Sequence, residues 1–268
     1  MIDRLSINQY TLKQLSLPQF VRGCAEDQIH FVALWRDKVA ETGIKETVAL
    51  LNQTGVRLSS LCRGGFFPAK TALRRQQNME DNYRAVDEAV ELGADLLVLV
   101  CGGIANADIE ESRKSVLDGI GTLLPYAQQA GIKLGIEPLH PMFVADRSVI
   151  VTLRQANEIM AALPSPNLGV VIDVYHVWWD PEIRTEIERA AGRILGFHVN
   201  DWIVPPPDIL NGRGMMGDGV IELRKLRQMV EKAGYRGPIE VEIFNEKIWQ
   251  MRPADLLRLT KERFLANV

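Results

Sequence analysis

The chain has 268 residues, of which 47% are hydrophobic and 24% charged, a composition that supports a large buried core and excludes a disordered protein. Its 31 basic and 34 acidic residues give a net charge of -3 without a basic cluster, which argues against nucleic acid as a partner. No apolar run approaches the roughly 18 residues of a membrane span, and the chain enters a predicted strand almost at once. We therefore expect a cytoplasmic protein that does not bind a membrane.

Eight short apolar segments bounded by turn residues predict buried parallel strands. They lie at 3–9, 28–34, 56–61, 95–100, 132–137, 168–173, 194–199 and 238–243. Amphipathic segments separate them, a short one at 17–24 and longer ones at 43–53, 78–92, 110–130, 151–162, 181–191, 220–233 and 252–266. Glycines at predicted helix exits, such as Gly93 and Gly131, support these boundaries.

This alternation of strands and helices predicts the fold class α/β, as a single (β/α)8 barrel over residues 1–268. The length would also suit two average domains, but no linker interrupts the alternation. No glycine-rich phosphate loop follows the first strand, as it would in a doubly wound nucleotide-binding sheet. Cys24, Cys62 and Cys101 are odd in number and lack metal-binding spacing, so we expect buried reduced thiols.

The last four predicted strands each end on a side chain that can bind a metal ion: Glu137, Asp173, His198 and Glu242. A single carboxylate at a strand end is usually a helix cap or an ion-pair partner, but in a barrel these four would converge. Three carboxylates buried together are unfavourable unless a cation neutralises them. Oxygen and imidazole donors without a thiolate suit one divalent ion, Mn²⁺ above all, with Mg²⁺, Co²⁺ or Zn²⁺ as alternatives.

Further candidate substrate-binding residues follow the same strand ends. His176 can orient a substrate hydroxyl or serve as an additional metal ligand, with a hydrogen bond to the backbone as the alternative, and His140 can contact the substrate or support a ligand from behind. Arg213 follows the seventh strand and offers fixed donors to hydroxyls or to an anionic group, unless it is solvated. Phe66 and Trp179 belong to aromatic loops that can wall off a small polar ligand, cap the barrel, or join the interface of a homo-oligomer.

Two other features lead to expectations about this end of the barrel. The segment Gly64-Gly65-Phe66-Phe67 predicts a lid, because two glycines give backbone freedom beside two large apolar side chains. Glu240 has the strand parity of Glu242, so it should face the same side one layer lower. No phosphate loop or strong basic cluster marks a phosphate site, which favours an unphosphorylated substrate.

Five motifs carry a resemblance to a known family. They are Gly135-Ile136-Glu137-Pro138, Asp173-Val174-Tyr175-His176, Phe197-His198-Val199-Asn200-Asp201, Gly217-Asp218-Gly219 and Tyr235-Arg236-Gly237-Pro238. With them the chain resembles, over nearly its whole length, the sugar phosphate isomerase/epimerase group of xylose isomerase-like barrels. That group includes ketose 3-epimerases, inosose isomerases and dehydratases, hydroxypyruvate isomerases and the endonuclease IV repair enzymes.

The resemblance to ketose 3-epimerases implies a division of roles within the site. Glu137 and Glu242 would both bind the metal and exchange protons with the substrate. Asp173 and His198 would only hold the ion. The same resemblance implies that His176 and Arg213 contact substrate oxygens.

The leading hypothesis is therefore a metal-dependent isomerase or epimerase of a keto sugar or an inosose-type polyol ketone. Chelation of a carbonyl and its neighbouring hydroxyl would acidify the C–H bond between them and stabilise an enediolate, with the two glutamates as proton carriers. One rival is a dehydratase that expels a β-hydroxyl from the same intermediate. Another is a non-catalytic sugar-binding barrel, which would need no pair of proton carriers.

A phosphodiesterase of the endonuclease IV type is a more remote alternative. Such an enzyme binds three zinc ions and needs additional histidines after strands 3 and 4 and near the Gly-Asp-Gly turn. This chain has Arg63-Gly64-Gly65, Cys101-Gly102-Gly103 and Gly217-Asp218-Gly219 in those regions, without a histidine. The acidic pI of about 5.9 also counts against a DNA substrate.

Overall fold

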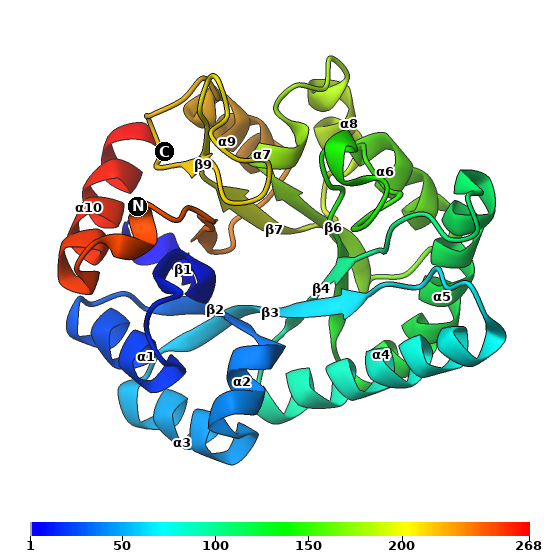
Figure 1. The fold of residues 1–268 in the computed structure, drawn as a ribbon, viewed down its shortest axis with the longest axis horizontal. Coiled ribbons are helices and arrows are strands. Elements are labelled where there is room, and N and C mark those ends of the chain that lie inside the picture. Colours follow the sequence, from blue (N-terminus) through cyan, green and yellow to red (C-terminus); the bar gives the residue numbers. More distant parts are fainter. Residues whose placement is uncertain (1) are drawn as a thin grey trace.

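The computed structural model describes residues 2–268, in which eight parallel strands close into a barrel surrounded by helices (Figure 1). Around the barrel the strands are β1 (Leu5–Asn8), β2 (Phe31–Trp35), β3 (Arg57–Gly65), β4 (Leu96–Val100), β5 (Lys133–Ile136), β6 (Leu168–Asp173), β7 (Ile194–Val199) and β10 (Ile239–Val241), which pairs with β1. This confirms the predicted (β/α)8 barrel. Met1, the first residue of the predicted domain, lies outside the described residues.

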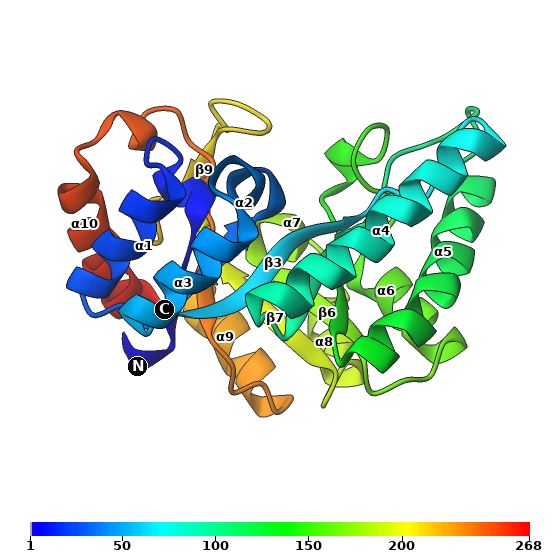
Figure 2. The same ribbon diagram turned by 90° about the horizontal axis from the view of Figure 1, so that it is seen from below.

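The helices lie outside the barrel, with α4 and α5 side by side along one flank (Figure 2). Their bounds are α1 (Leu17–Glu26), α2 (Arg36–Thr42), α3 (Ile44–Thr54), α4 (Ala72–Leu92), α5 (Ile109–Ala130), α6 (Leu153–Ala162), α7 (Val174–Val177), α8 (Ile183–Arg189), α9 (Leu223–Lys232) and α10 (Pro253–Asn267). Short 3-10 turns lie at Ile2–Arg4, Gln9–Leu12, Pro141–Phe143 and Ile248–Gln250. None of the helices within residues 2–268 combines the length and the apolar character that crossing a membrane requires.

The helices differ from the prediction where their sequences lack an apolar stripe. In α2 the only buried residue among those described is Val39, so its seven residues show no helical period. The helix α4 begins at Ala72 rather than at residue 78, because the Thr71 side chain caps the backbone N–H of Arg74 and the first turns are solvent-exposed. The glycines predicted at helix exits are confirmed, since Gly93 and Gly131 both adopt the left-handed conformation.

The core fills the space between the strands and the surrounding helices. Every residue of β4 and β6 is buried, as expected for parallel strands covered on both faces. Cys24, Cys62 and Cys101 are buried and free, which confirms the prediction of reduced thiols. A separate small apolar cluster, which comes from β3, β4 and β6 of the barrel wall, contains Cys62, Leu96, Val98 and Val171.

The segment predicted to form a lid is held firmly in the structure. Gly64 and Gly65 are the last residues of β3, and the Asn82 side chain accepts a hydrogen bond from the Gly65 N–H (2.6 Å) and donates one to the Gly65 carbonyl (2.8 Å). A Cβ at Gly65 would lie 2.0 Å from the carbonyl oxygen of Val100. Phe67 is buried in the core, against Gly119. These glycines permit close packing in this structure, and the predicted movement of a lid over the substrate stays a prediction.

Candidate metal centre

Four side chains converge where the carboxyl ends of the strands meet. Glu137 directly follows β5, Asp173 ends β6, His198 lies in β7 and Glu242 directly follows β10. One ligand atom of each lies within 4.8 Å of those of the other three, and none of the four residues is more than 5% exposed. The structure thus brings together the residues that the sequence singled out.

The donor set fits a divalent cation. In the part of the chain that the structure describes, Glu137 Oε1 and both ring nitrogens of His198 are buried without a hydrogen-bond partner. His198 Nδ1 lies 3.3 Å from Glu137 Oε1 and 3.7 Å from Glu242 Oε2, but these atoms are not aligned for hydrogen bonds. Buried polar atoms without partners are unfavourable, and a cation that accepts oxygen and nitrogen ligands would satisfy them.

Burial and the neighbouring charges also shift the pKa values of this group. Burial raises the pKa of Glu137 to about 7, and the neighbouring carboxylates of Glu242 and Asp173 act in the same direction. Burial opposes a charged imidazole at His198, yet Glu240, Glu137 and Glu242 outweigh it and raise its pKa well above the usual range. The cluster therefore retains protons near neutral pH that a bound cation would displace.

Asp173 behaves differently from the other carboxylates. Burial alone would raise its pKa, but the guanidinium of Arg213 and the nearby His176 outweigh burial and lower it to about 2. Its Oδ1 also accepts hydrogen bonds from the backbone N–H of Tyr175 and from the side-chain amide of Asn200, each at 2.9 Å. The bond from Tyr175 caps the single turn of α7. Asp173 thus caps a helix and is also a candidate metal ligand. These two roles for a carboxylate at a strand end do not exclude one another here.

A small hairpin carries Arg213 over the barrel. Strand β8 (Asp201–Trp202) pairs antiparallel with β9 (Arg213–Gly214), and the Asp201 carboxylate fixes the turn beyond it by accepting the N–H groups of Gly217 (2.9 Å) and Ile221 (3.0 Å). Asn245 donates to the Arg213 carbonyl at 2.8 Å. The Gly-Asp-Gly motif is therefore part of the support that positions Arg213.

The Arg213 guanidinium lies between two candidate ligands. Its Nη1 donates to Asp173 Oδ2 at 2.8 Å and to Glu242 Oε2 at 2.9 Å, and its Nη2 lies 3.2 Å from His176 Nε2. The rings of Tyr175 and Phe244 both lie close to this guanidinium, with centroids 4.9 and 4.8 Å from its carbon atom. Arg213 thus supplies part of the positive charge that the carboxylates need.

The two predicted substrate histidines differ in position. His176 is buried and lines the cleft above the cluster, and burial lowers its pKa to about 3, so the ring is neutral. The His140 N–H donates to His176 Nδ1 at 3.2 Å, and its ring lies 5.6 Å from that of Trp179. The Trp179 indole donates to the His176 carbonyl at 2.8 Å. His140 and Trp179 are therefore behind His176, outside the lining of the cleft.

Three polar residues of the site were not assigned a role from the sequence. Asn8, at the end of β1, donates to Glu240 Oε1 (2.8 Å) and Glu242 Oε1 (3.0 Å), with its own oxygen held by the indole of Trp35 (2.9 Å). Asn200 donates to Asp173 and to the Glu242 carbonyl. The third is Glu240. The strand-end rule that found the ligands would also have found Asn8.

Glu240 faces the barrel interior one layer below Glu242, as its strand parity predicted. Its Oε2 lies 3.5 Å from His198 Nε2 and accepts hydrogen bonds from Ser59 and Ser60, each at 3.1 Å. The two atoms do not form a hydrogen bond, but a carboxylate at this distance favours a proton on that nitrogen and raises the pKa of the ring. This leaves His198 Nδ1 directed at Glu137 and Glu242.

Glu240→Gln is expected to weaken Mn²⁺ binding by about 10- to 100-fold, because the ring of His198 loses its charged partner while side-chain volume is kept. Isothermal titration calorimetry would measure the affinity, and ¹⁵N NMR of the imidazole would report its tautomer. Glu246→Gln, an exposed change of the same charge, serves as the control. Unchanged affinity together with an unchanged tautomer would contradict the role.

The two phenylalanines of the predicted lid are expected to respond differently to truncation. Phe67→Ala should lower the free energy of unfolding by roughly 3–5 kcal/mol, because it empties a packed core position. Phe66→Ala should leave stability within about 1 kcal/mol but raise KM, since its ring packs 3.9 Å from the guanidinium of Arg63, a residue of the cleft. Chemical denaturation and steady-state kinetics separate the two effects, and equal effects on KM would refute this assignment.

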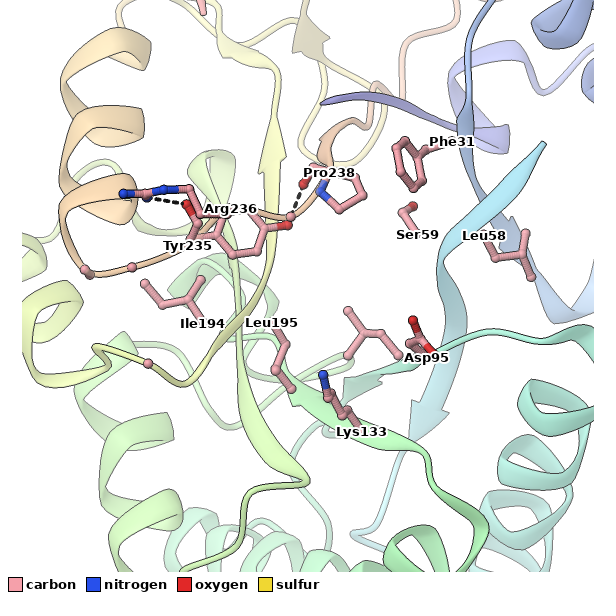
Figure 3. Close-up of a pocket in the computed structure, with 15 residues that line it drawn as sticks. Phe31, Leu58, Ser59, Asp95, Lys133, Ile194, Leu195, Tyr235, Arg236 and Pro238 are labelled. Carbon is pink, nitrogen blue, oxygen red and sulfur yellow. Dashed lines mark hydrogen bonds between the residues drawn. The ribbon is translucent and has the colours of Figure 1, made fainter. Parts of the chain in front are cut away.

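The cleft above the cluster is narrow. Its free volume is about 50 Å³, and its lining includes Glu137, Glu242, His176 and Arg213, with Arg63 and Arg147 among the remainder. A larger cavity of about 320 Å³ lies at the opposite end of the barrel (Figure 3). Its charged residues are Asp95, Lys133 and Arg236, and the Arg236 guanidinium is engaged with the Tyr235 carbonyl. Barrel enzymes bind substrates at the carboxyl ends of the strands, so we assign the site to the narrow cleft.

Comparison with known proteins gives a consistent result. A family model described as xylose isomerase-like TIM barrel matches residues 22–265. An L-ribulose-5-phosphate 3-epimerase of Escherichia coli O157:H7 is 23% identical over 75% of this chain and 71% of its own length. A 3-dehydroshikimate dehydratase of Pseudomonas putida is 28% identical over 65% of this chain, which spans only 27% of that protein.

A solved structure resembles the whole chain. The crystal structure of a protein from Sinorhizobium meliloti 1021 has a TM-score of 0.97 and 45% sequence identity to it. The alignment covers 100% of this chain and 99% of that one.

Proposed function

Since the chain belongs to the xylose isomerase-like TIM barrel family, we propose that it is a metal-dependent isomerase or epimerase of a keto sugar or an inosose-type polyol ketone. One observation carries this proposal. Of the four candidate ligands, Glu137 and Glu242 line the cleft, whereas Asp173 and His198 lie beneath its lining. Two carboxylates thus face a substrate while the other two residues only hold the ion, as a reaction with two proton carriers requires.

Glu137, Asp173, His198 and Glu242 would hold one divalent cation, with Mn²⁺ as the first candidate. When bound, the ion would polarise the substrate carbonyl and the neighbouring hydroxyl and so acidify the C–H bond between them. One glutamate removes that proton, and the other returns a proton to the opposite face of the carbon in an epimerisation, or to the adjacent carbon in an isomerisation. Coordination lowers the basicity of both carboxylates, while the same ion would acidify the substrate C–H bond. The glutamate that accepts the proton is ionised at the start of the reaction, and the glutamate that returns a proton first takes it up from solvent.

The remaining polar residues of the cleft orient the substrate. His176 and Arg213 present ring and guanidinium nitrogens to substrate oxygens. The free volume of about 50 Å³ is far below the roughly 300–1,000 Å³ of typical ligand sites. Because Arg213 is held by Asp173 and Glu242, we propose that it moves towards the substrate once a cation takes over those carboxylates.

The test is a panel of ketoses and inososes incubated with Mn²⁺-loaded protein in deuterated water and followed by NMR. We expect one substrate to exchange a C–H hydrogen for deuterium and to yield an isomer or epimer. Loss of a hydroxyl instead would identify a dehydratase, the alternative favoured by the similarity to the Pseudomonas enzyme. Failure of every compound to exchange, with the metal shown to be bound, would overturn the proposal.

A further inference from the structure

Two arginines of the cleft lining have little negative charge beside them: Arg63 has no ion-pair partner among residues 2–268, and Arg147 has only the exposed carboxylate of Asp146, 3.9 Å away. Arg63 lies near the end of β3 and Arg147 in the loop after β5, and both line the cleft that also includes Glu137 and Glu242. We propose that the substrate carries an anionic group, a carboxylate or a phosphate, which these two guanidinium groups bind. This inference rests on the proposed function in taking the cleft as the substrate site.

Arg63 has no carboxylate partner because its acidic neighbours are already engaged. Arg36 donates to both oxygens of Asp81 (3.0 and 3.1 Å) and forms an ion pair with Glu88, while Arg84 binds Asp81 as well. Across residues 2–268, no carboxylate oxygen lies within ion-pair distance of the Arg63 guanidinium, which stacks on the Phe66 ring at 3.9 Å. A half-buried cation of this kind is exposed to a ligand but lacks a counterion.

The position of Arg147 is fixed by its backbone, while its side chain reaches the cleft. Its N–H donates to the Phe143 carbonyl at 3.0 Å, and its own carbonyl accepts the N–H of Gly102 at 2.8 Å. The carboxylate near its guanidinium is that of Asp146, 3.9 Å away and itself exposed. The Phe143 ring lies 5.8 Å from the guanidinium carbon. A contact of this length to an exposed carboxylate does little to neutralise the charge.

The two arginines also influence one another. Burial lowers the pKa of Arg63, and the charge of Arg147 lowers it further, so the positive charges are close enough to repel. The carboxylates deeper in the cleft do not relieve this repulsion, because Arg213 holds two of them and a divalent ion would bind the same group. An anion that enters between Arg63 and Arg147 would remove the repulsion and gain charge-assisted hydrogen bonds.

This inference revises the expectation, drawn from the sequence, that the substrate carries no phosphate. No basic cluster is visible there because Arg63 and Arg147 are far apart along the chain, and each reads as an ordinary loop arginine. The closure of the barrel brings them to one cleft. The Phe66 ring stacks on the Arg63 guanidinium at 3.9 Å and leaves its planar N–H donors free for carboxylate or phosphate oxygens.

Two matched pairs of ligands would test the inference and distinguish its two forms. L-Ribulose 5-phosphate is compared with L-ribulose, and 3-dehydroshikimate with its methyl ester, by isothermal titration calorimetry on the Mn²⁺-loaded protein. In at least one pair the charged member should bind about 10- to 100-fold more tightly than the neutral one. The pair that shows the preference identifies phosphate or carboxylate as the group recognised.

The ratio of affinities for the charged and the neutral ligand should fall towards one in Arg63→Gln and in Arg147→Gln. Arg63→Lys should keep part of this preference, because lysine retains the charge but lacks the planar donors. Arg75→Gln, an equal change of charge on the exposed face of α4, should keep it. Equal binding within both pairs, absence of binding by all four ligands, or a preference that survives both glutamine variants would overturn the inference. If the protein turns over a neutral ketose and shows no preference for charged ligands, only the inference of an anion site fails. If it prefers charged ligands but exchanges no substrate proton, only the proposed function fails.

Discussion

Glutamine at position 137 or at position 242 is expected to lower kcat by between about 10² and 10⁴. Both side chains line the cleft, and a glutamine amide keeps the volume and an oxygen donor but cannot take up or deliver a proton. Catalysis by proton transfer should therefore fail in each variant, even where the substrate still binds. Steady-state kinetics at saturating Mn²⁺, with metal content measured on the same samples, would separate this loss from loss of the ion.

Deuterated water makes this prediction sharper. Product formed by the parent protein should carry deuterium at the carbon whose configuration changes, because the second glutamate returns a solvent-derived proton. A single-base shuttle could return the original hydrogen instead. Each variant keeps one carrier and should exchange the substrate hydrogen with solvent without net turnover. If both variants hold metal and keep near-parental turnover, the proton-transfer roles are wrong.

The fold was predictable because each strand of a closed barrel is a short apolar run flanked by amphipathic helices. The segments 168–173 and 194–199 coincide with β6 and β7, since their buried faces leave a clear pattern. The helix α2 was missed because it is short and mostly solvent-exposed, so no apolar period marks it. At Gly65 the local sequence did not indicate the constraint, because the contact that requires a glycine is with Val100 on the paired strand β4.

The candidate site was predictable to the extent that strand ends determine it. Glu137 and Glu242 could be found because a parallel barrel gathers the residues at the ends of its strands. The partnership of Asn8 with Glu240 depends on the closure between β1 and β10, which joins residues from the two ends of the chain. The sequence left open whether His140 contacts the substrate or supports a neighbouring residue. Its N–H donates to His176 Nδ1, so the structure places it behind His176, and its contact with a substrate stays a prediction.

The Asp173→Asn variant is expected to bind Mn²⁺ more than about 100-fold more weakly, because it removes the charge of a carboxylate proposed to bind the ion directly. Loss of a residue that only supports a ligand usually costs about 10- to 100-fold. The dependence of that affinity on pH should nevertheless persist. The pKa of Asp173 lies at about 2, so it is ionised before the ion binds and releases no proton. In the parent protein the affinity should rise with pH through about 7, because Glu137 and His198 must lose their protons to act as ligands.

Glu137→Gln provides the contrast that identifies the source of this pH dependence. It removes a group whose pKa is raised to about 7, so fewer protons should be released on binding and the affinity should depend less steeply on pH. Titration calorimetry in buffers of different ionisation enthalpy counts those protons directly. Equal proton release by the parent and the Glu137 variant would show that Glu137 is already ionised before the metal binds. An Asp173 variant that binds Mn²⁺ as tightly as the parent would place the ion elsewhere than between these four side chains.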